Sequence, residues 1–159
     1  MNIPLILQAF GAFGIITSFV YTAVQIRRNT LSFRAGTYLQ VTSAFANTWI
    51  NFASDPNMID LILRGTDDFQ RLDRVEKARF RFACMGYLRQ IENAYFLHRL
   101  EILKSSDWQG VVGDLDAFLS RPGTRDVWDL IKHCSGEEFR KYVQEVVDRH
   151  TINPESKIA

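Results

Sequence analysis

The opening stretch of the chain is apolar and uncharged. Residues 1–26 contain no charged side chain, and two arginines follow at once. Within residues 5–24 the polar groups are few: Gln8, Thr17, Ser18, Tyr21 and Thr22. Twenty residues at helical rise extend about 30 Å, the thickness of the hydrocarbon layer of a bilayer. The pattern therefore predicts a single transmembrane helix within residues 1–28.

Two other interpretations of this segment stay open. A cleaved signal peptide needs a basic region before its apolar core and small residues at its cleavage site. Here no Lys or Arg precedes the apolar run, and the residues behind it, 24–28, are bulky and basic. A buried core helix is usually shorter, and a helix that is apolar nearly all round is typical of a span. The pattern favours the membrane span.

The arginines behind the span predict its orientation. Arg27, Arg28 and Arg34 come directly after it, and no acidic residue precedes Asp55. Basic residues beside a span stay on the cytoplasmic side. We therefore expect the N-terminus outside and residues 29–151 in the cytoplasm, with the three arginines at the lipid headgroups.

Small and polar residues follow one side of the predicted span. At about 100° per residue they share a sector of roughly 120°; they are Gln8, Gly11, Gly14, Ser18, Thr22 and Gln25. Such a stripe lets another helix approach closely and offers it hydrogen bonds within lipid. The stripe can also arise by chance, since these residue types are common in spans. If it is functional, Gly11, Gly14, Ser18 and Thr22 pack against another membrane subunit or a second copy.

Helical periodicity continues behind the arginines. Apolar residues recur every three or four positions over 31–52, so this helix is expected to continue from the span. It should end before Pro56, because a proline disfavours helical geometry in the preceding residue. A short helix is predicted over 57–64, closed by Gly65.

A long helix is predicted to follow, with Asp73 and Glu76 as its capping box and its end near Lys104. It carries two apolar stripes, which would place it at the centre of a domain. The first holds Phe80, Cys84, Tyr87, Leu88, Ile91, Tyr95 and Ile102. The second holds Val75, Ala78, Phe82, Met85, Phe96 and Leu103.

Three further helices complete the pattern. One begins around Ser106 and ends before Pro122, the next covers 124–132, and the last begins at Ser135. Residues 152–159 are expected to be a tail. No run of alternating β-branched residues predicts a strand, so the fold is expected to be all-α.

Charge and cysteine content exclude several classes of function. Residues 1–54 carry three arginines and no acid, whereas residues 55–159 carry 16 basic against 18 acidic residues. This distribution suits a membrane-proximal end and lacks the basic face of a nucleic-acid-binding domain. Only Cys84 and Cys134 are present, without the ligand spacing of a zinc site, so no metal or cofactor is predicted.

Four polar residues of the long helix are the candidates for chemistry: Arg89, Glu92, Tyr95 and His98. A pocket around them could serve an enzyme, with His98 as base or ligand. The plainer interpretation makes Arg89 and Glu92 a structural ion pair and His98 a core-edge residue bonded to a carbonyl. The pattern favours the structural interpretation. Trp49, Trp108 and Trp128 are likewise expected in the core rather than in a ligand cage.

Several segments carry a resemblance that covers most of the chain. They are SFVYTAVQIRRNT at 18–30, followed by Arg34 and Tyr38, then ENAY at 92–95, Trp108, SRPG at 120–123, Trp128, and FRKYV at 139–143. In these segments the chain resembles a widespread family of uncharacterised bacterial proteins with an N-terminal hydrophobic helix and a small helical domain. The resemblance implies a bacterial membrane and an all-helical domain, and it carries over no activity and no catalytic residue.

These observations lead to one expected architecture and three candidate functions. The architecture is a transmembrane helix at 1–28, a compact cytoplasmic bundle of about five helices at 29–151, and a tail. The favoured function is a non-enzymatic accessory subunit of a larger bacterial inner-membrane complex. The alternatives are a self-associating membrane-tethered adaptor or sensor, and an enzyme with a pocket around the four polar residues.

Overall fold

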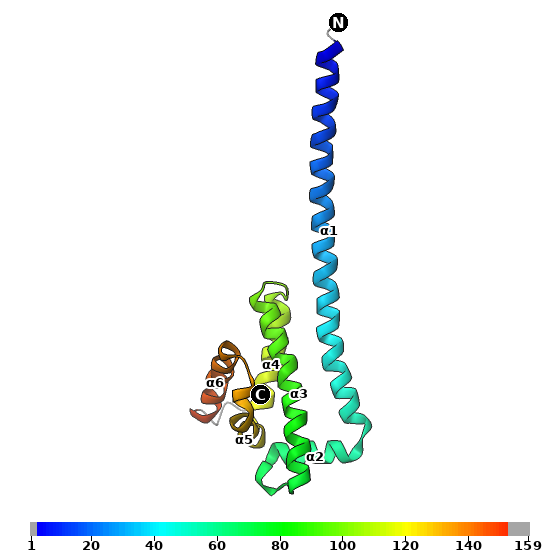
Figure 1. Ribbon diagram of the computed structural model, residues 1–159. Coiled ribbons are helices and arrows are strands. Elements are labelled where there is room, and N and C mark those ends of the chain that lie inside the picture. Colours follow the sequence, from blue (N-terminus) through cyan, green and yellow to red (C-terminus); the bar gives the residue numbers. More distant parts are fainter. Residues whose placement is uncertain (1–2, 153–159) are drawn as a thin grey trace. The chain divides into compact units, whose positions relative to one another are not determined.

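The structure, a computed structural model, describes the backbone of residues 3–152 and the side chains of residues 13–151. This part of the chain forms six α-helices and two short 3-10 helices and contains no strand (Figure 1). The all-α prediction is therefore confirmed. The chain divides into two compact units, residues 1–39 and 40–159.

The first helix, α1, runs without interruption over Ile3–Ser54. The expected continuity past the arginines is confirmed, and the helix ends just before Pro56, as predicted. Asp55 then adopts an extended backbone and its carboxylate accepts a hydrogen bond of 2.9 Å from the backbone N–H of Asn57. This side-chain cap begins the next helix, with proline in its first turn.

The transmembrane prediction is not supported by the described residues. Among them, no helix combines the length and the apolar character that a bilayer crossing requires. Of the uncharged run before Arg27, the described side chains cover only residues 13–26, which are fourteen in number against about 20 for a span. The side chains of residues 5–12, with which the predicted span begins, lie outside the described part.

Helix α2 spans Pro56–Asp67 and is followed by η1 at Phe69–Arg71. The prediction that Gly65 closes this helix is wrong, because Gly65 is a buried residue within its last turn. A Cβ added there would lie 2.6 Å from the Phe80 ring, and one added to Gly123 would lie 1.9 Å from the Gly65 carbonyl oxygen. Gly65 therefore serves close packing between helices rather than a left-handed cap.

Helix α3 spans Arg74–Arg99 and begins with the predicted capping box. The Asp73 carboxylate accepts from the backbone N–H groups of Val75 and Glu76, at 2.7 and 2.8 Å. Glu76 in turn accepts from the N–H of Asp73 and from the guanidinium of Arg64 on α2. The hydrogen bonds from Arg64 and then from Asp73 lower the pKa of Glu76 to about 2.

The first apolar stripe of α3 is buried, as predicted, up to Tyr95. The second stripe is only partly a core face: Val75 and Phe82 are 66% and 63% exposed, whereas Leu103 is buried. The helix also ends five residues before Lys104. Glu101 has a φ of 57°, a left-handed conformation that no α-helix accommodates, so the chain turns there.

The remaining helices are α4 at Ser105–Leu119, α5 at Pro122–Ile131, η2 at Lys132–Cys134, and α6 at Glu137–Ile152. All three α-helices lie where predicted, although α5 begins at the proline rather than after it, since proline fits the first turn. Residues 153–159, most of the predicted tail, lie outside the described residues.

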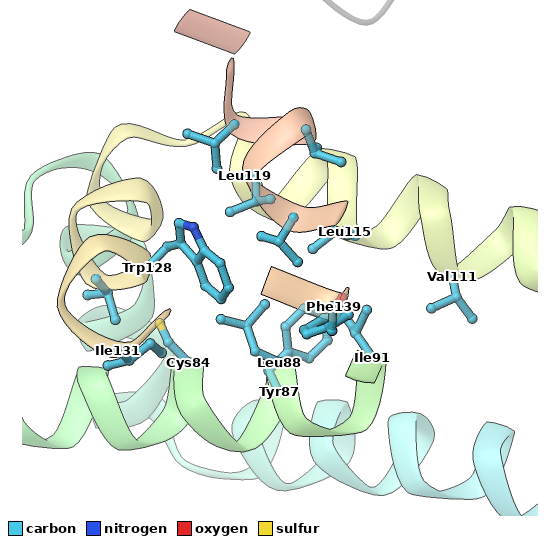
Figure 2. Close-up of a cluster of buried hydrophobic side chains, with 14 of the residues drawn as sticks. Cys84, Tyr87, Leu88, Ile91, Val111, Leu115, Leu119, Trp128, Ile131 and Phe139 are labelled. Carbon is cyan, nitrogen blue, oxygen red and sulfur yellow. The ribbon is translucent and has the colours of Figure 1, made fainter. Parts of the chain in front are cut away.

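The core of the second unit lies among α3, α4, α5 and α6. Figure 2 shows Leu115 and Leu119 of α4 converging with Trp128 of α5 and Leu88 of α3. Trp128 is fully buried, and its indole N–H faces the Gln144 side-chain oxygen at 3.4 Å. Contacts join α3 to α2, α4 and α5, which confirms its expected central place.

Candidate functional site

The first candidate surface is the apolar part of α1 before the arginines. Its large side chains are exposed, as Phe13 at 69% and Phe19 at 72% illustrate. The others over this stretch are Ile15, Ile16, Val20, Tyr21, Val24 and Ile26. Exposed apolar side chains that follow one another around a helix mark a surface for a protein partner or for lipid.

The residues of the small-residue stripe whose side chains the structure describes are exposed. A Cβ added to Gly14 would meet no atom within 4 Å, and Ser18 and Thr22 are exposed. The Thr22 hydroxyl donates to the Ser18 carbonyl at 2.8 Å, so it is satisfied within its own helix. Gly11, the remaining stripe residue, lies outside the residues whose side chains are described. Arg27, Arg28 and Arg34 are exposed.

Glu92 is the most buried of the four candidate polar residues. Glu92 is 3% exposed. Its Oε1 accepts a hydrogen bond of 2.7 Å from the backbone N–H of Gly136 at the start of α6. Its Oε2 pairs with the guanidinium of Arg89, which also donates to the Cys134 carbonyl at 3.0 Å. Glu92 and Arg89 thus tie α3 to the segment that leads into α6. Both carboxylate oxygens of Glu92 are engaged in this tie.

His98 lies apart from this tie and packs against Trp108. The two rings are stacked with centroids 5.4 Å apart and an interplanar angle of 10°. The Nδ1 atom of His98 lies 3.3 Å from the Leu103 carbonyl oxygen. Tyr95 packs against Trp108 and Phe139, at 5.9 and 5.5 Å between ring centroids. The geometry is that of a core-edge histidine in an aromatic cluster.

An apolar pocket of about 230 Å³ lies elsewhere, and none of the four polar candidates lines it. The end of α1 contributes Trp49 and Phe52, while α3 contributes Tyr87 and α4 contributes Phe118. The rings form a chain: the centroids of Trp49 and Tyr87 are 5.4 Å apart, and those of Tyr87 and Phe118 are 5.0 Å apart. Remaining lining residues are Ile62, Thr66, Phe80, Ala83, Cys84, Asp114, Ala117, Arg121 and Thr124.

Two charged residues line the otherwise apolar pocket. Arg121 is ion-paired with Asp67 at 3.5 Å. Asp114 has no ion pair within the described part of the chain, and partial burial raises the pKa of its carboxyl. Burial, and then the charge of Asp114, also raise the pKa of the Tyr87 phenol. Burial raises the pKa of the Cys84 thiol to about 12, which keeps this wall of the pocket uncharged.

The sequence did not predict this pocket. Trp108 and Trp128 are buried, as expected, but Trp49 is 50% exposed at the pocket. The lining residues come from five helices, α1 to α5, and their side chains come together only through the packing of those helices. The single signal in the sequence is the spacing of Asp114, Ala117 and Phe118, which places an acid beside apolar residues on one face of a helix.

Comparison with known proteins adds no relative. No protein-family model matches the chain, and neither a curated protein nor a solved structure is similar to it. The resemblance to a bacterial family therefore stays a prediction from the segments quoted for it.

Proposed function

We propose that this chain is a non-enzymatic interaction protein of the bacterial inner membrane, most concretely an accessory subunit of a larger membrane complex. Its N-terminal helix would cross the bilayer with the N-terminus outside, and the helical domain would lie in the cytoplasm. The observation that carries the proposal is the exposure of apolar side chains all around α1 over residues 13–26. A crossing requires residues 5–12 as well, and their sequence is equally free of charge.

The physical argument concerns what covers this surface. Soluble proteins rarely expose contiguous apolar patches beyond a few hundred Å², because such surface is unfavourable in water. Residues 40–159 bury a core of their own, so their folding does not require α1 before residue 40 as a core element. The apolar helix is therefore available for lipid or for a partner.

The arrangement of the polar candidates supports a role without catalysis. Arg89 and Glu92 hold two segments together, and His98 stacks on a tryptophan. A catalytic acid or base needs a reacting group within hydrogen-bond reach, whereas both carboxylate oxygens of Glu92 already accept hydrogen bonds from the protein. The enzyme alternative would therefore have to use other residues.

Self-association is the second candidate, and the open surface at Gly14 is the observation that favours it. A second copy could lay its own stripe against this one, since small residues on both sides allow close approach. The oligomeric state in a mild detergent distinguishes the candidates: a homodimer indicates the adaptor, and co-purification with a defined set of larger subunits indicates the accessory role.

Membrane extraction and a topology reporter test the proposal. We expect the full chain to stay in membranes washed with alkaline carbonate and to be released by detergent. A C-terminal alkaline phosphatase fusion should be inactive, because this reporter needs the periplasm, while a fluorescent-protein fusion should be bright. Release by carbonate would place the apolar helix against protein rather than lipid. An active phosphatase would overturn the orientation.

Replacing Arg27, Arg28 and Arg34 together by Glu tests the proposed cause of the orientation. If basic residues hold this end in the cytoplasm, the triple variant should insert poorly or in the reverse direction. Unchanged topology and yield would contradict the headgroup role. The matched control is the triple Lys variant, which keeps the charges and should insert normally.

A further inference from the structure

The pocket among α1, α2, α3, α4 and the start of α5 offers an unassigned ligand site within residues 40–159. Its volume of about 230 Å³ lies below the roughly 300–1,000 Å³ of sites for drug-sized molecules, so an occupant must be small. Half of the Trp49 surface is exposed, so the pocket opens to solvent beside an aromatic wall. A ligand can therefore enter without unfolding of the domain.

The rings around the pocket suit a positive group. The faces of aromatic rings carry negative charge, and a cation within about 6 Å of a ring centroid is attracted to it. Trp49, Tyr87 and Phe118 follow one another with centroids 5.0 to 5.4 Å apart. Three aromatic side chains therefore border one small cavity, and an organic ammonium group bound there would contact them.

The charges at the pocket point in the same direction. Asp114 lines the pocket and has no ion pair within the described residues, so its negative charge is available to a ligand. Arg121, the basic lining residue, is already paired with Asp67. A bound cation would place its charge near a carboxylate and its apolar atoms against aromatic and aliphatic walls.

We infer that this pocket binds a small organic cation, an ammonium group carried on a short apolar body. The aromatic wall of Trp49 and Tyr87 would hold the cationic head, and Asp114 would neutralise it. The inference stands apart from the membrane proposal, because every lining residue belongs to the second unit.

Three probes of nearly the same shape and different charge test the inference. Choline carries a positive charge, 3,3-dimethyl-1-butanol is its neutral counterpart, and 3,3-dimethylbutyrate is anionic. The full chain, kept in a nonionic detergent, would be labelled with 5-fluorotryptophan and followed by fluorine NMR. Trp49 lies at the pocket, whereas Trp108 and Trp128 do not line it and serve as internal controls. The Trp49→Phe variant assigns the pocket signal.

We expect choline to shift the Trp49 resonance to saturation and to leave the other two in place. Asp114→Asn should weaken choline binding up to about fivefold, the effect of losing one partly exposed charged partner. Asp129→Asn, the same charge change outside the pocket, should leave it unchanged. Ala117→Leu should fill the pocket and abolish the shift, with the two control resonances reporting an intact fold.

Four outcomes would overturn the inference. Equal or tighter binding of the neutral alcohol would show an apolar cavity without selectivity for charge. Tighter binding of the carboxylate would assign the pocket to Arg121 and an anion. Absence of a saturable shift with choline would show that no such site exists. Full affinity in Asp114→Asn would show that Asp114 does not neutralise the ligand.

Discussion

At the scale of single residues, two glycines set how closely the helices of the second unit can pack. A Cβ on Gly123 would lie 1.9 Å from the carbonyl oxygen of Gly65, a distance that no packed carbon reaches. Neither glycine has a positive φ, so their role is the absence of a side chain rather than an unusual backbone. The crossing of α2 and α5 therefore depends on the missing side chain of Gly123, whereas the missing side chain of Gly65 makes room for the Phe80 ring of α3.

Gly123→Ala should destabilise the fold by at least the roughly 1–3 kcal/mol of an overpacked core, because backbone must move to admit the methyl group. Gly110→Ala is the matched control. Its Cβ would meet nothing within 4 Å, and alanine in a helix interior gains about 1 kcal/mol over glycine. Urea unfolding of both variants should shift the midpoint in opposite directions. A neutral Gly123→Ala would contradict the close crossing.

The two cysteines should differ sharply in reactivity. Cys84 is buried, and its raised pKa of about 12 leaves almost no thiolate at neutral pH, whereas Cys134 is exposed. Iodoacetamide should therefore add one label per folded chain, at Cys134, and two labels after denaturation. Mass spectrometry of the labelled peptides checks both the number and the site. Rapid labelling of Cys84 in the folded chain would show that the pocket wall opens.

The pH dependence of stability should carry the signature of Asp114. Partial burial raises the pKa of this carboxyl above its ordinary value of 3.8, so the folded state holds the proton more tightly than the unfolded state. The stabilising contribution of the protonated Asp114 carboxyl to folding is present below pH 3.8 and is lost as the pH rises through the folded pKa. Asp114→Asn should therefore gain stability over wild type from about pH 4 upward. A difference that stays constant with pH would contradict this cause.

At the scale of elements, Glu92 joins α3 to the start of α6. Glu92→Ala would remove the acceptor of the Gly136 N–H and the partner of Arg89, which should cost about 1–3 kcal/mol. Glu138→Ala is the control, since its pair with Arg99 is exposed with N and O 3.6 Å apart, and such pairs contribute 0–1 kcal/mol. Denaturant unfolding measures both. Similar small losses would show that the tie is not structural.

The sequence predicted the elements well where local signals were strong. The stop at Pro56 and the capping box of Asp73 and Glu76 lie where expected, because both depend on neighbouring backbone groups. The end of α3 was missed, since the turn at Glu101 uses a left-handed residue that no glycine marks. The second apolar stripe was misjudged because periodicity shows that a face is apolar but not whether another helix covers it.

At the candidate site, too, features set by neighbouring residues were predicted and features set by helix packing were missed. The role of Glu92 and Arg89 as a structural pair was predicted from their spacing of three residues, and the carbonyl contact of His98 from its place at the edge of an apolar stripe. The pocket was missed because Trp49, Tyr87 and Asp114 meet only after helices distant in sequence have packed. No local pattern records which helix lies beside which.

At the scale of the whole molecule, the two units differ in whether their apolar side chains are buried. Residues 40–159 bury a core, whereas residues 13–39 expose their apolar side chains. The sequence of the first unit is therefore under a different physical constraint from that of the second. The remaining question is which surface of α1 contacts lipid, another subunit or a second copy.

Gly14→Leu addresses that question directly. Since nothing lies within 4 Å of a Cβ there, the chain itself tolerates the larger side chain, and any effect must come from a neighbour. If a helix packs on the stripe, leucine separates the two backbones, and the packing attraction falls steeply with distance. The variant should then leave its complex or dimer while staying in the membrane.

Phe13→Leu, which keeps an apolar contact on the other side, should do neither. Native electrophoresis of detergent extracts measures association in both variants. Equal association would mean that the stripe is chance and that the second unit holds any partner.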